Sequence, residues 1–354
     1  MIIPTSESVA ITASPAAGLG RDCVVTVVIK ALNEEKRIEV AIESALAAVA
    51  GIGGEVVLAD SCSTDRTIEL ASRYPIRIVQ LSSASERCCG VGPQLGYQHS
   101  SGEFVYILDG DMQMLDGFLP KAVEFLRQHP EFAGVAGQVV EMNTHSLEYV
   151  ARMERATGHM QSGEVDRLDM GGLYRRSAVE AVEYFSDRNL HSYEEFDLAV
   201  RLRAKGWKLF RIEEAAVRHH GHDAPPYDLL RRRWRSRYIC GLGELMRSSW
   251  GTPRFALVAE GVSELKIYLA VWFWWLVMLL VLISPIDGPL KTGWFTALFL
   301  MPFVVMAIRK RSLRKSIFSV VSWCFNAAGL MRGLLTPRKS PEDTIASVVV
   351  RDAV

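Results

Sequence analysis

The chain has 354 residues, 49% of them hydrophobic, and its formal net charge at pH 7 is +0. A chain of this length buries a full core, and its balanced charge argues against the large basic surface that nucleic-acid binding needs. Its six cysteines include no CxxC pair and no spacing that suits zinc, which is typical of reduced thiols in the cytosol.

Residues 1–22 are rich in Ser, Ala and Gly. They lack a basic start followed by a long apolar core, so they do not resemble a secretory signal. We expect a mobile N-terminal tail here, followed by a folded domain over residues 23–250.

Strands and helices alternate through the first part of this domain. Apolar, β-branched runs predict strands, and apolar residues at helical spacing predict the helices between them. The predicted strands are 24–29, 55–59, 76–81 and 104–108, and the predicted helices are 34–50, 66–74 and 93–100. This order predicts an α/β fold with a mostly parallel sheet sandwiched by helices. Ligands of such sheets bind at the carboxyl ends of the strands.

Polar residues follow the first two predicted strands. Asn33 and Glu35 come after the first strand, and Asp60 stands at the end of the second. Asp60 can accept hydrogen bonds from a base or a ribose, and we take it as the functional residue there. Asp65 and the hydroxyl groups just before it are typical of a helix cap, and we interpret them as structural.

Asp109 and Asp111 flank Gly110 directly after the fourth predicted strand. Alternation along a strand places both carboxylates on one face, and Gly110 has no side chain to block a ligand. Mg²⁺ and Mn²⁺ prefer carboxylate oxygens together with substrate phosphates, so the pair predicts a metal site. Taken alone, Asp-Gly-Asp favours an ordinary turn, and it is the neighbouring motifs that favour the cation.

A glycine-rich stretch, residues 90–96, imitates a dinucleotide-binding loop. It does not directly follow a strand and has no acidic partner at the right distance, which argues against that function. We interpret it as a loop that binds a sugar nucleotide, with Gln94 as the candidate side chain and a plain loop as an equal alternative.

Three carboxylates, Glu194, Glu195 and Asp197, precede a run with helical spacing. They lie in the first turn of a predicted helix, where acids are favoured and where one of them can face a site. Asp197 stands four residues before Arg201, and we expect these two side chains to form a structural ion pair. The other two acids are candidates for a general base.

Two later clusters can serve an anionic ligand. His219 follows an apolar strand candidate, although a structural histidine is about as common at such a position. Residues 231–237 are rich in arginine, whose guanidinium fork matches diphosphate oxygens, and Arg233 and Trp234 are the candidates within them. A basic stripe that lies on anionic lipid explains the same arginines equally well.

The C-terminal region, residues 251–354, is apolar enough to reach lipid. We predict spans at about 267–284 and 293–308, the first just long enough for a hydrocarbon core of roughly 30 Å. The basic block 309–315 should stay in the cytosol by the positive-inside rule. Residues 316–335 mix aromatic residues with Ser, Asn and Gly, and we predict an interfacial helix there. A buried helical hairpin in a soluble protein is the minority alternative.

The ordered motifs between residues 24 and 247 resemble those of the family 2 glycosyltransferases. The series consists of Val27-Val28-Ile29 with Asn33-Glu34-Glu35, the Asp60 motif, Ser101-Gly102-Glu103 before Asp109-Gly110-Asp111, Gly171-Gly172, and Tyr193-Glu194-Glu195-Phe196-Asp197-Leu198. The ordered set is far more specific than any single member. The resemblance implies a GT-A fold and inverting transfer of a sugar from a nucleotide diphosphate sugar.

The same resemblance implies roles for single residues. Asp60 would contact the nucleotide base, and Asp109 and Asp111 would bind ribose, diphosphate and a metal ion. Glu195 would be the catalytic base, because the family's usual Glu-Asp places its base second, although this chain has Glu there instead of Asp. His219 matches a position where relatives often carry a metal-ligating or phosphate-binding histidine.

Arg233-Trp234 resembles part of the Gln-x-x-Arg-Trp element of processive polysaccharide synthases. Leu230 replaces the glutamine, and the predicted spans are too few to form a conduit, so we do not expect chain extrusion.

We therefore expect an integral membrane glycosyltransferase whose catalytic domain faces the cytosol. It would use Mg²⁺ or Mn²⁺ and a nucleotide diphosphate sugar to glycosylate a lipid-linked or glycan acceptor in polysaccharide biosynthesis. Two alternatives from other classes are a metal-dependent nucleotidyltransferase and a non-catalytic membrane scaffold that binds nucleotide sugar.

Overall fold

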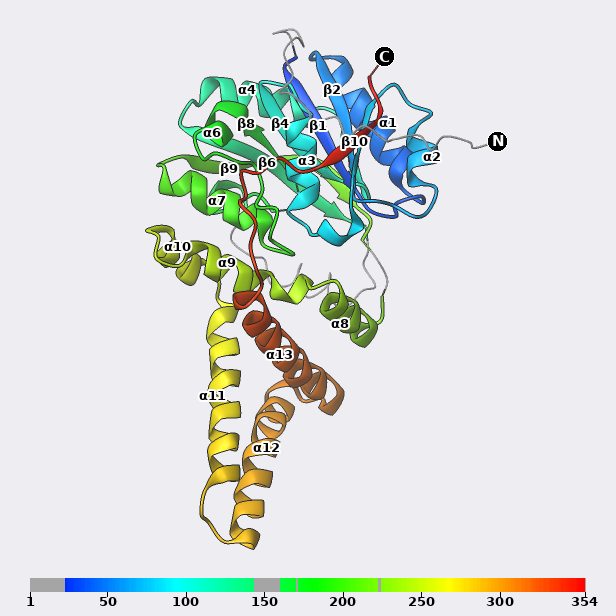
Figure 1. Ribbon diagram of the computed structural model, residues 1–354. Helices are drawn as coiled ribbons and strands as arrows, with labels where there is room; N and C mark the ends of the chain where they lie inside the picture. The colour runs from blue at the N-terminus through cyan, green and yellow to red at the C-terminus, as the bar shows by residue number, and fades with distance from the viewer. Residues whose placement is uncertain (1–22, 143–159, 170, 222–223, 354) are drawn as a thin grey trace, which may run out of the picture.

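Figure 1 shows the computed structural model of the protein, which describes residues 23–142, 160–169, 171–221 and 224–353. Within these ranges ten strands form one sheet, and three long helices project from the sheet domain on its lower side in this view. The predicted mobile tail, residues 1–22, lies outside the described residues.

The strands are β1 (Val25–Ala31), β2 (Gly54–Asp60), β3 (Arg77–Leu81), β4 (Phe104–Asp109), β5 (Met112–Met114), β6 (Phe132–Glu141), β7 (Gly163–Val165), β8 (Gly172–Arg175), β9 (Lys208–His219) and β10 (Ser347–Arg351). Their order in the sheet is β10-β3-β2-β1-β4-β8-β6-β9-β5, and β7 pairs with β9. The neighbours β3, β2, β1 and β4 are parallel, as predicted. The other half is mixed, because β8, β5 and β7 run antiparallel to their partners.

Helices cover both faces of the sheet (Figure 1). They are α1 (Ile38–Ala50), α2 (Thr67–Ala71), α3 (Val91–Gln98), α4 (Phe118–Gln128), α6 (Arg176–Glu180) and α7 (Glu194–Ala204), with a 3₁₀ turn η1 (Ala84–Glu86). Alternate residues of β1 enter two separate cores: Val27 and Ile29 pack with α1 and α4, and Val28 packs with α3 and α7. A strand buried on both faces is continuously apolar, which explains the sequence of β1.

Helix α1 begins at Ile38 rather than at residue 34, where the apolar spacing placed it. Asn33 has a left-handed φ of 60°, and its backbone N–H donates to Ser63 Oγ at 2.8 Å. The next two amides donate to Thr67 Oγ1 at 2.8 Å and to Asp65 Oδ2 at 3.1 Å. These side chains hold the segment in a loop beside the end of β2, so the helix starts only after it.

Four shorter helical segments lie below the sheet in Figure 1: α8 (Pro226–Arg235), η3 (Tyr238–Cys240), α9 (Gly241–Ser249) and α10 (Arg254–Gly261). Leu242 and Leu245 of α9 share a third apolar cluster with Phe196 and Val200 of α7. Helix α7 is therefore packed between the sheet and these membrane-proximal segments.

Three C-terminal helices are long and apolar enough to cross a membrane by length and composition: α11 (Glu264–Ile283), α12 (Gly288–Lys310) and α13 (Leu313–Leu334). Helices α11 and α12 form the predicted hairpin, with the Trp274 indole N–H donating to the Leu298 carbonyl at 3.0 Å. Helix α13 returns toward the sheet domain, and its Leu330 is buried in an apolar cluster with residues of α7 and α9. The interfacial placement of α13 remains a prediction.

The last segment of the chain returns to the sheet. Strand β10 pairs antiparallel with β3, with Val349 opposite Val79, and adds an edge to the parallel half. Ser347 Oγ also lies 3.0 Å from His99 Nε2. The expectation that every residue after 250 belongs to the membrane anchor is therefore corrected for this strand, whose short β-branched run did not distinguish it from the apolar segments before it.

Candidate active site

The carboxyl ends of β2, β1 and β4 meet at one edge of the sheet. Ala31 lies opposite Asp60, and Lys30 lies opposite Asp109, so the in-register parallel strands end together. Strand β1 lies between β2 and β4: the chain first builds β2 and β3 on one side of β1 and then crosses from β3 to form β4 on the other side. Ligands of open α/β sheets bind in the crevice at such a point.

Lys30 joins this edge to helix α7. Its Nζ lies 2.9 Å from Asp109 Oδ1 and 3.5 Å from Glu194 Oε1. Burial opposes the lysine charge, but the carboxylates of Asp109, Glu194 and Glu195 outweigh it and raise the pKa of Lys30 well above its usual range. Lys30 was not among the residues predicted from the sequence, although it is the one charged side chain in the apolar run of β1.

Glu195 lies in the first turn of α7, close to Lys30. Burial raises the pKa of this carboxyl to about 8; the Lys30 charge acts to lower it, and Asp169 and Glu194 raise it further. A side chain whose pKa lies near the working pH can both take up and release a proton. The environment of Glu195 therefore suits a general base.

Asp197 has the structural role that its spacing predicted. Its Oδ2 accepts from Arg201 Nε at 2.8 Å, and both side chains are buried. The same guanidinium donates to the backbone carbonyls of Tyr184 and Phe185. The expected i,i+4 ion pair is confirmed, and it fixes α7 to the segment before it.

Asp60 is fully buried at the end of β2 and keeps one oxygen unpaired. Its Oδ2 accepts from the Ser63 backbone N–H at 2.8 Å and from Gln80 Nε2 at 2.9 Å. Its Oδ1 has no hydrogen-bond partner. A buried carboxylate oxygen without a donor is costly, so a ligand N–H that reaches it would gain a charge-assisted hydrogen bond.

Glu34 is a second site residue that was not predicted from the sequence. Burial and the nearby Asp111 and Asp109 raise the pKa of this carboxyl to about 7. Its side chain lies over Gly110, where an added Cβ would come within 2.8 Å of Glu34 Cγ. Gly110 thus makes room for a carboxylate of the chain itself, and three acids share this side of the site.

His219 and Asp111 face each other across β9 and the start of β5. His219 Nδ1 lies 2.7 Å from Glu141 Oε2, and His219 Nε2 lies 3.6 Å from Asp111 Oδ2. A carboxylate behind one ring nitrogen holds the other nitrogen toward the site, which is the usual support of a metal-ligating histidine. Burial and Asp109 raise the pKa of Asp111 above its usual range.

These residues fit a divalent cation that is shared with a diphosphate. Asp111 and His219 supply an oxygen and a nitrogen, and Mg²⁺ or Mn²⁺ often takes few protein ligands and completes its shell with phosphate oxygens. Across the ranges that the structure describes, no three His, Cys, Asp or Glu side chains form a group that could hold a metal by themselves. Asp109, expected as a third ligand, pairs with Lys30 instead.

Asn33 and Glu35 make contacts within the loop at the sheet edge. Asn33 Oδ1 accepts from the Thr64 backbone N–H at 2.7 Å. Glu35 Oε2 accepts from the Arg66 backbone N–H at 3.3 Å. Both side chains join the loop after β1 to the loop after β2, and their predicted contact with nucleotide remains a prediction.

Gln94 supports the fold of the neighbouring segment. Its buried Oε1 accepts from the backbone N–H groups of Phe185 and Ser186, at 2.9 and 3.0 Å. This geometry favours a structural role over the nucleotide contact that the glycine-rich stretch suggested, because the amide oxygen is already bonded.

The two residues chosen from the basic run, Arg233 and Trp234, face other parts of the chain. The Cζ atom of Arg233 lies 5.1 Å from the centre of the Tyr238 ring. The Trp234 ring packs edge-on against Phe325 of α13, with 5.6 Å between the ring centres. Arg232 instead lies close enough to Glu34 to lower the pKa of that carboxyl. Of this run, Arg232 is the arginine that the structure brings toward the acidic cluster.

The comparisons with known proteins agree with this architecture. Residues 26–182 match the family described as glycosyl transferase family 2. The mannosyltransferase PcManGT from Pyrobaculum calidifontis, solved in complex with GDP-Man and Mn2+, shares the fold with a TM-score of 0.58 at 17% identity. That likeness covers 88% of this chain and 87% of PcManGT.

Curated relatives match over a shorter stretch. "Probable glucomannan 4-beta-mannosyltransferase 1" of Arabidopsis thaliana is 28% identical over 155 residues, which is 41% of this chain and 27% of the relative. "Probable glucomannan 4-beta-mannosyltransferase 7" of Oryza sativa subsp. japonica is 27% identical over 185 residues, 49% of this chain and 30% of the relative. The chain thus spans less than a third of the length of these relatives.

Proposed function

We propose that the protein is a membrane-anchored, inverting glycosyltransferase that moves a sugar from a nucleotide diphosphate sugar to a lipid-linked or cell-surface polysaccharide precursor. The observation that carries the proposal is the position of Glu195, a carboxyl of raised pKa beside Lys30 at the carboxyl ends of the central strands. Asp60, with its unpaired buried oxygen, would bind the nucleotide base at the same edge.

The reaction in this proposal is a single displacement at the anomeric carbon. Glu195 takes the proton of an acceptor hydroxyl, whose oxygen forms a bond to that carbon. The bond between the carbon and the diphosphate oxygen breaks, and the diphosphate leaves with the electron pair on the opposite face, which inverts the configuration. Holding acceptor and donor in line supplies much of the rate in such a step.

Charge on the diphosphate would be offset from two sides. Asp111 and His219 would hold a divalent cation, which when bound neutralises the developing charge of the leaving group. Arg232 of α8 lies near the acidic cluster and can approach the same phosphates from the membrane side. Glu34, whose pKa is raised to about 7, would release its proton as a cation approaches.

The three long apolar helices support a membrane-bound enzyme. The basic residues Arg309 and Lys310 close α12 at the end nearer to the sheet domain, as the positive-inside rule requires of a cytosolic end. Anchoring would keep the active site at the surface where membrane lipid and lipid-linked acceptors lie.

The proposal is tested by the release of nucleoside diphosphate from a panel of UDP- and GDP-sugars. Membranes that contain the full chain are incubated with each donor, Mn²⁺ or Mg²⁺, and a lipid extract as the acceptor source. GDP-mannose is the first donor to test, because PcManGT was solved with GDP-Man and the curated relatives are mannosyltransferases by name.

We expect metal-dependent release from one donor and a product of inverted anomeric configuration. Release should be lost in Glu195→Gln, and the exposed Glu213→Gln variant is its matched control, since the same chemical change on the surface of β9 should leave release unchanged. Donor binding without release from any donor would overturn the proposal in favour of a non-catalytic scaffold.

A further inference from the structure

The segment 187–193, which we call the base loop, runs directly into helix α7 and its N-terminal glutamates. Tyr193 ends it with a left-handed φ of 67° as the N-cap residue of α7. Glu194 and Glu195 follow at once. Any shift of the base loop therefore moves the first turn of the helix that carries the proposed base.

The first anchor of the base loop is an ion pair with the C-terminal tail, by which we mean residues 335–346 between α13 and β10. Asp187 is fully buried, and its Oδ2 lies 2.6 Å from Arg338 Nη2. Its Oδ1 accepts from the backbone N–H and the Nδ2 of Asn189, at 2.9 and 2.6 Å. Asn189 in turn donates to the Lys339 carbonyl at 3.0 Å and accepts from the Lys339 N–H at 2.8 Å. The base loop is thus tied to the chain just after α13.

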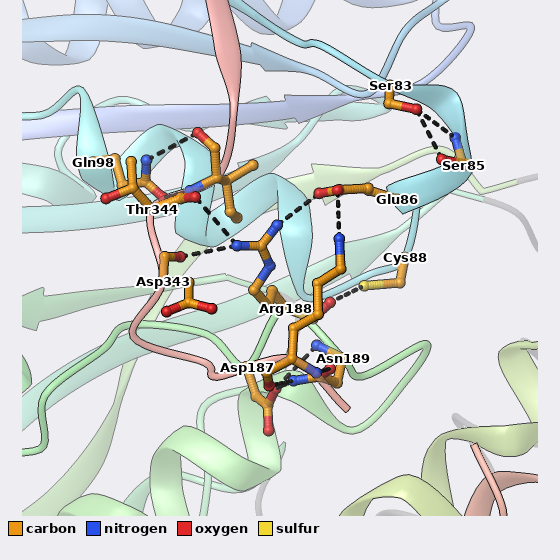
Figure 2. Close-up of polar contacts among 12 residues, drawn as sticks. Ser83, Ser85, Glu86, Cys88, Gln98, Asp187, Arg188, Asn189, Asp343 and Thr344 are labelled. Atoms are coloured by element: carbon orange, nitrogen blue, oxygen red, sulfur yellow. Dashed lines mark hydrogen bonds and ion pairs between the residues drawn. The ribbon is translucent and has the colours of Figure 1, made fainter. Parts of the chain in front are cut away.

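Figure 2 shows how the tail continues from this anchor. Arg188 of the base loop lies between the tail and η1: its Nη1 donates to the Asp343 carbonyl at 3.0 Å, and its Nη2 lies 2.6 Å from Glu86. Lys339 Nζ lies 2.6 Å from the other oxygen of Glu86. Beyond this point the tail becomes β10, so the tail is held along its length rather than at one residue.

The second anchor is a contact with helix α9. Glu244 is buried, its Oε2 accepts from the His191 backbone N–H at 3.0 Å, and its Oε1 lies 2.9 Å from His191 Nδ1. Ser192 Oγ donates to the Tyr238 carbonyl at 2.8 Å. The first contact joins the base loop to α9, and the second joins it to η3, which directly precedes α9.

Helices α9 and α13 are themselves packed without space for side chains. An added Cβ at Gly243 would collide with the Leu330 carbonyl, and one at Gly333 would collide with the Cys240 carbonyl. Such close backbone packing makes the two helices move as one unit. Both anchors of the base loop therefore lead to the same membrane-proximal unit.

We propose that the base loop couples this membrane-proximal unit to catalysis, with the pairs Asp187–Arg338 and His191–Glu244 as positioning residues that set the place of Glu195. The inference rests on the proposed function, because it takes Glu195 as the base. It makes the C-terminal tail part of the catalytic apparatus, although the tail contacts Glu195 only through the base loop.

The test compares full-length variants in membranes, with kcat, donor KM and equilibrium donor binding measured for each. In Arg338→Gln we expect kcat to fall by on the order of 10- to 100-fold, because a displaced base lowers the rate steeply, while donor KM and donor binding stay unchanged. Arg338→Lys, which keeps the charge, should restore part of the loss.

Two further variants complete the design. Arg127→Gln makes the same change at an exposed arginine of α4, whose 3.3 Å partner is Glu103 outside the base loop and the tail, and it should leave kcat unchanged. Because Arg338→Gln leaves a buried carboxylate without its counter-ion, Asp187→Asn tests the same pair with the unpaired charge on Arg338 instead, whose side chain is 21% exposed, and it should also lower kcat.

The outcomes separate the inference from the proposed function. If the wild-type protein releases nucleoside diphosphate from no donor, the proposed function fails and the inference with it. If the wild-type protein is active, the inference alone is overturned by either of two results: an unchanged kcat in Arg338→Gln and Asp187→Asn, or a loss of donor binding in step with the loss of transfer.

Discussion

Replacing Asp60 with Asn should weaken nucleotide binding without weakening the fold. The carboxylate is fully buried, with two donors on Oδ2 and none on Oδ1. An asparagine can keep its single oxygen toward Ser63 and Gln80, which places its NH₂ group where Oδ1 was. That group is a donor, so it opposes the N–H of an incoming base instead of accepting from it.

The size of the effect follows from one hydrogen bond. A hydrogen bond to a charged group contributes about 1.5 to 3 kcal/mol, and about 1.4 kcal/mol corresponds to a tenfold change in affinity. Asp60→Asn should therefore weaken UDP or GDP binding by on the order of 10- to 100-fold. The unliganded variant should be as stable as the wild type or more stable, because it no longer buries an unpaired anionic oxygen.

Isothermal titration with UDP and with GDP gives the affinity, and thermal unfolding of the same preparation gives the stability. Asp65→Asn is the matched control, since its carboxylate accepts from groups of the protein: the Thr67 hydroxyl at 2.6 Å, the Thr67 backbone N–H at 3.0 Å and the Glu35 backbone N–H at 3.1 Å. The control should lose some stability and keep nucleotide affinity. Unchanged affinity in Asp60→Asn, or a fall in its stability, would refute the reasoning.

Three further predictions concern the metal, the proton and the fold. Asp111→Asn should abolish the metal dependence of nucleotide binding, and titration with and without Mn²⁺ checks this. The kcat/KM of transfer should rise with pH through a midpoint near 8, because the buried Glu195 must lose its proton to act as a base, and Lys30→Met should move the midpoint to higher pH because a charge that lowers this pKa is gone. Arg201→Met should lower the free energy of unfolding by about 3 to 5 kcal/mol, since it strands the buried Asp197, and denaturant titration measures the loss.

The edge of the sheet where the site lies could be predicted from local patterns. An apolar, β-branched run that ends in Asp60 or Asp109 predicts a strand, and it also predicts that this aspartate lies at the carboxyl end of the strand. Asp197 and Arg201 are likewise close in sequence, so helical spacing sufficed for their pairing. In each case the interacting groups belong to one element or to a repeated strand-end pattern.

The partners of these residues come from distant parts of the chain, and local patterns do not reveal them. Lys30 can be identified as a site residue only in the folded structure, where α7 brings Glu194 to it. The ring of His219 is oriented by Glu141, which β6 places beside it in register. Strand β10 follows three apolar helices, so its short β-branched run has no local feature that assigns it to the edge of β3.

The central claim, that Glu195 is the base of a nucleotide-sugar transfer, is tested most directly by measuring transfer and donor binding together in Glu195→Gln. The side chain keeps its size and loses only the ability to accept the proton. The account predicts unchanged donor affinity and a transfer rate lower by on the order of 10²- to 10⁴-fold, the usual contribution of a positioned base. Transfer at the wild-type rate in this variant would contradict it.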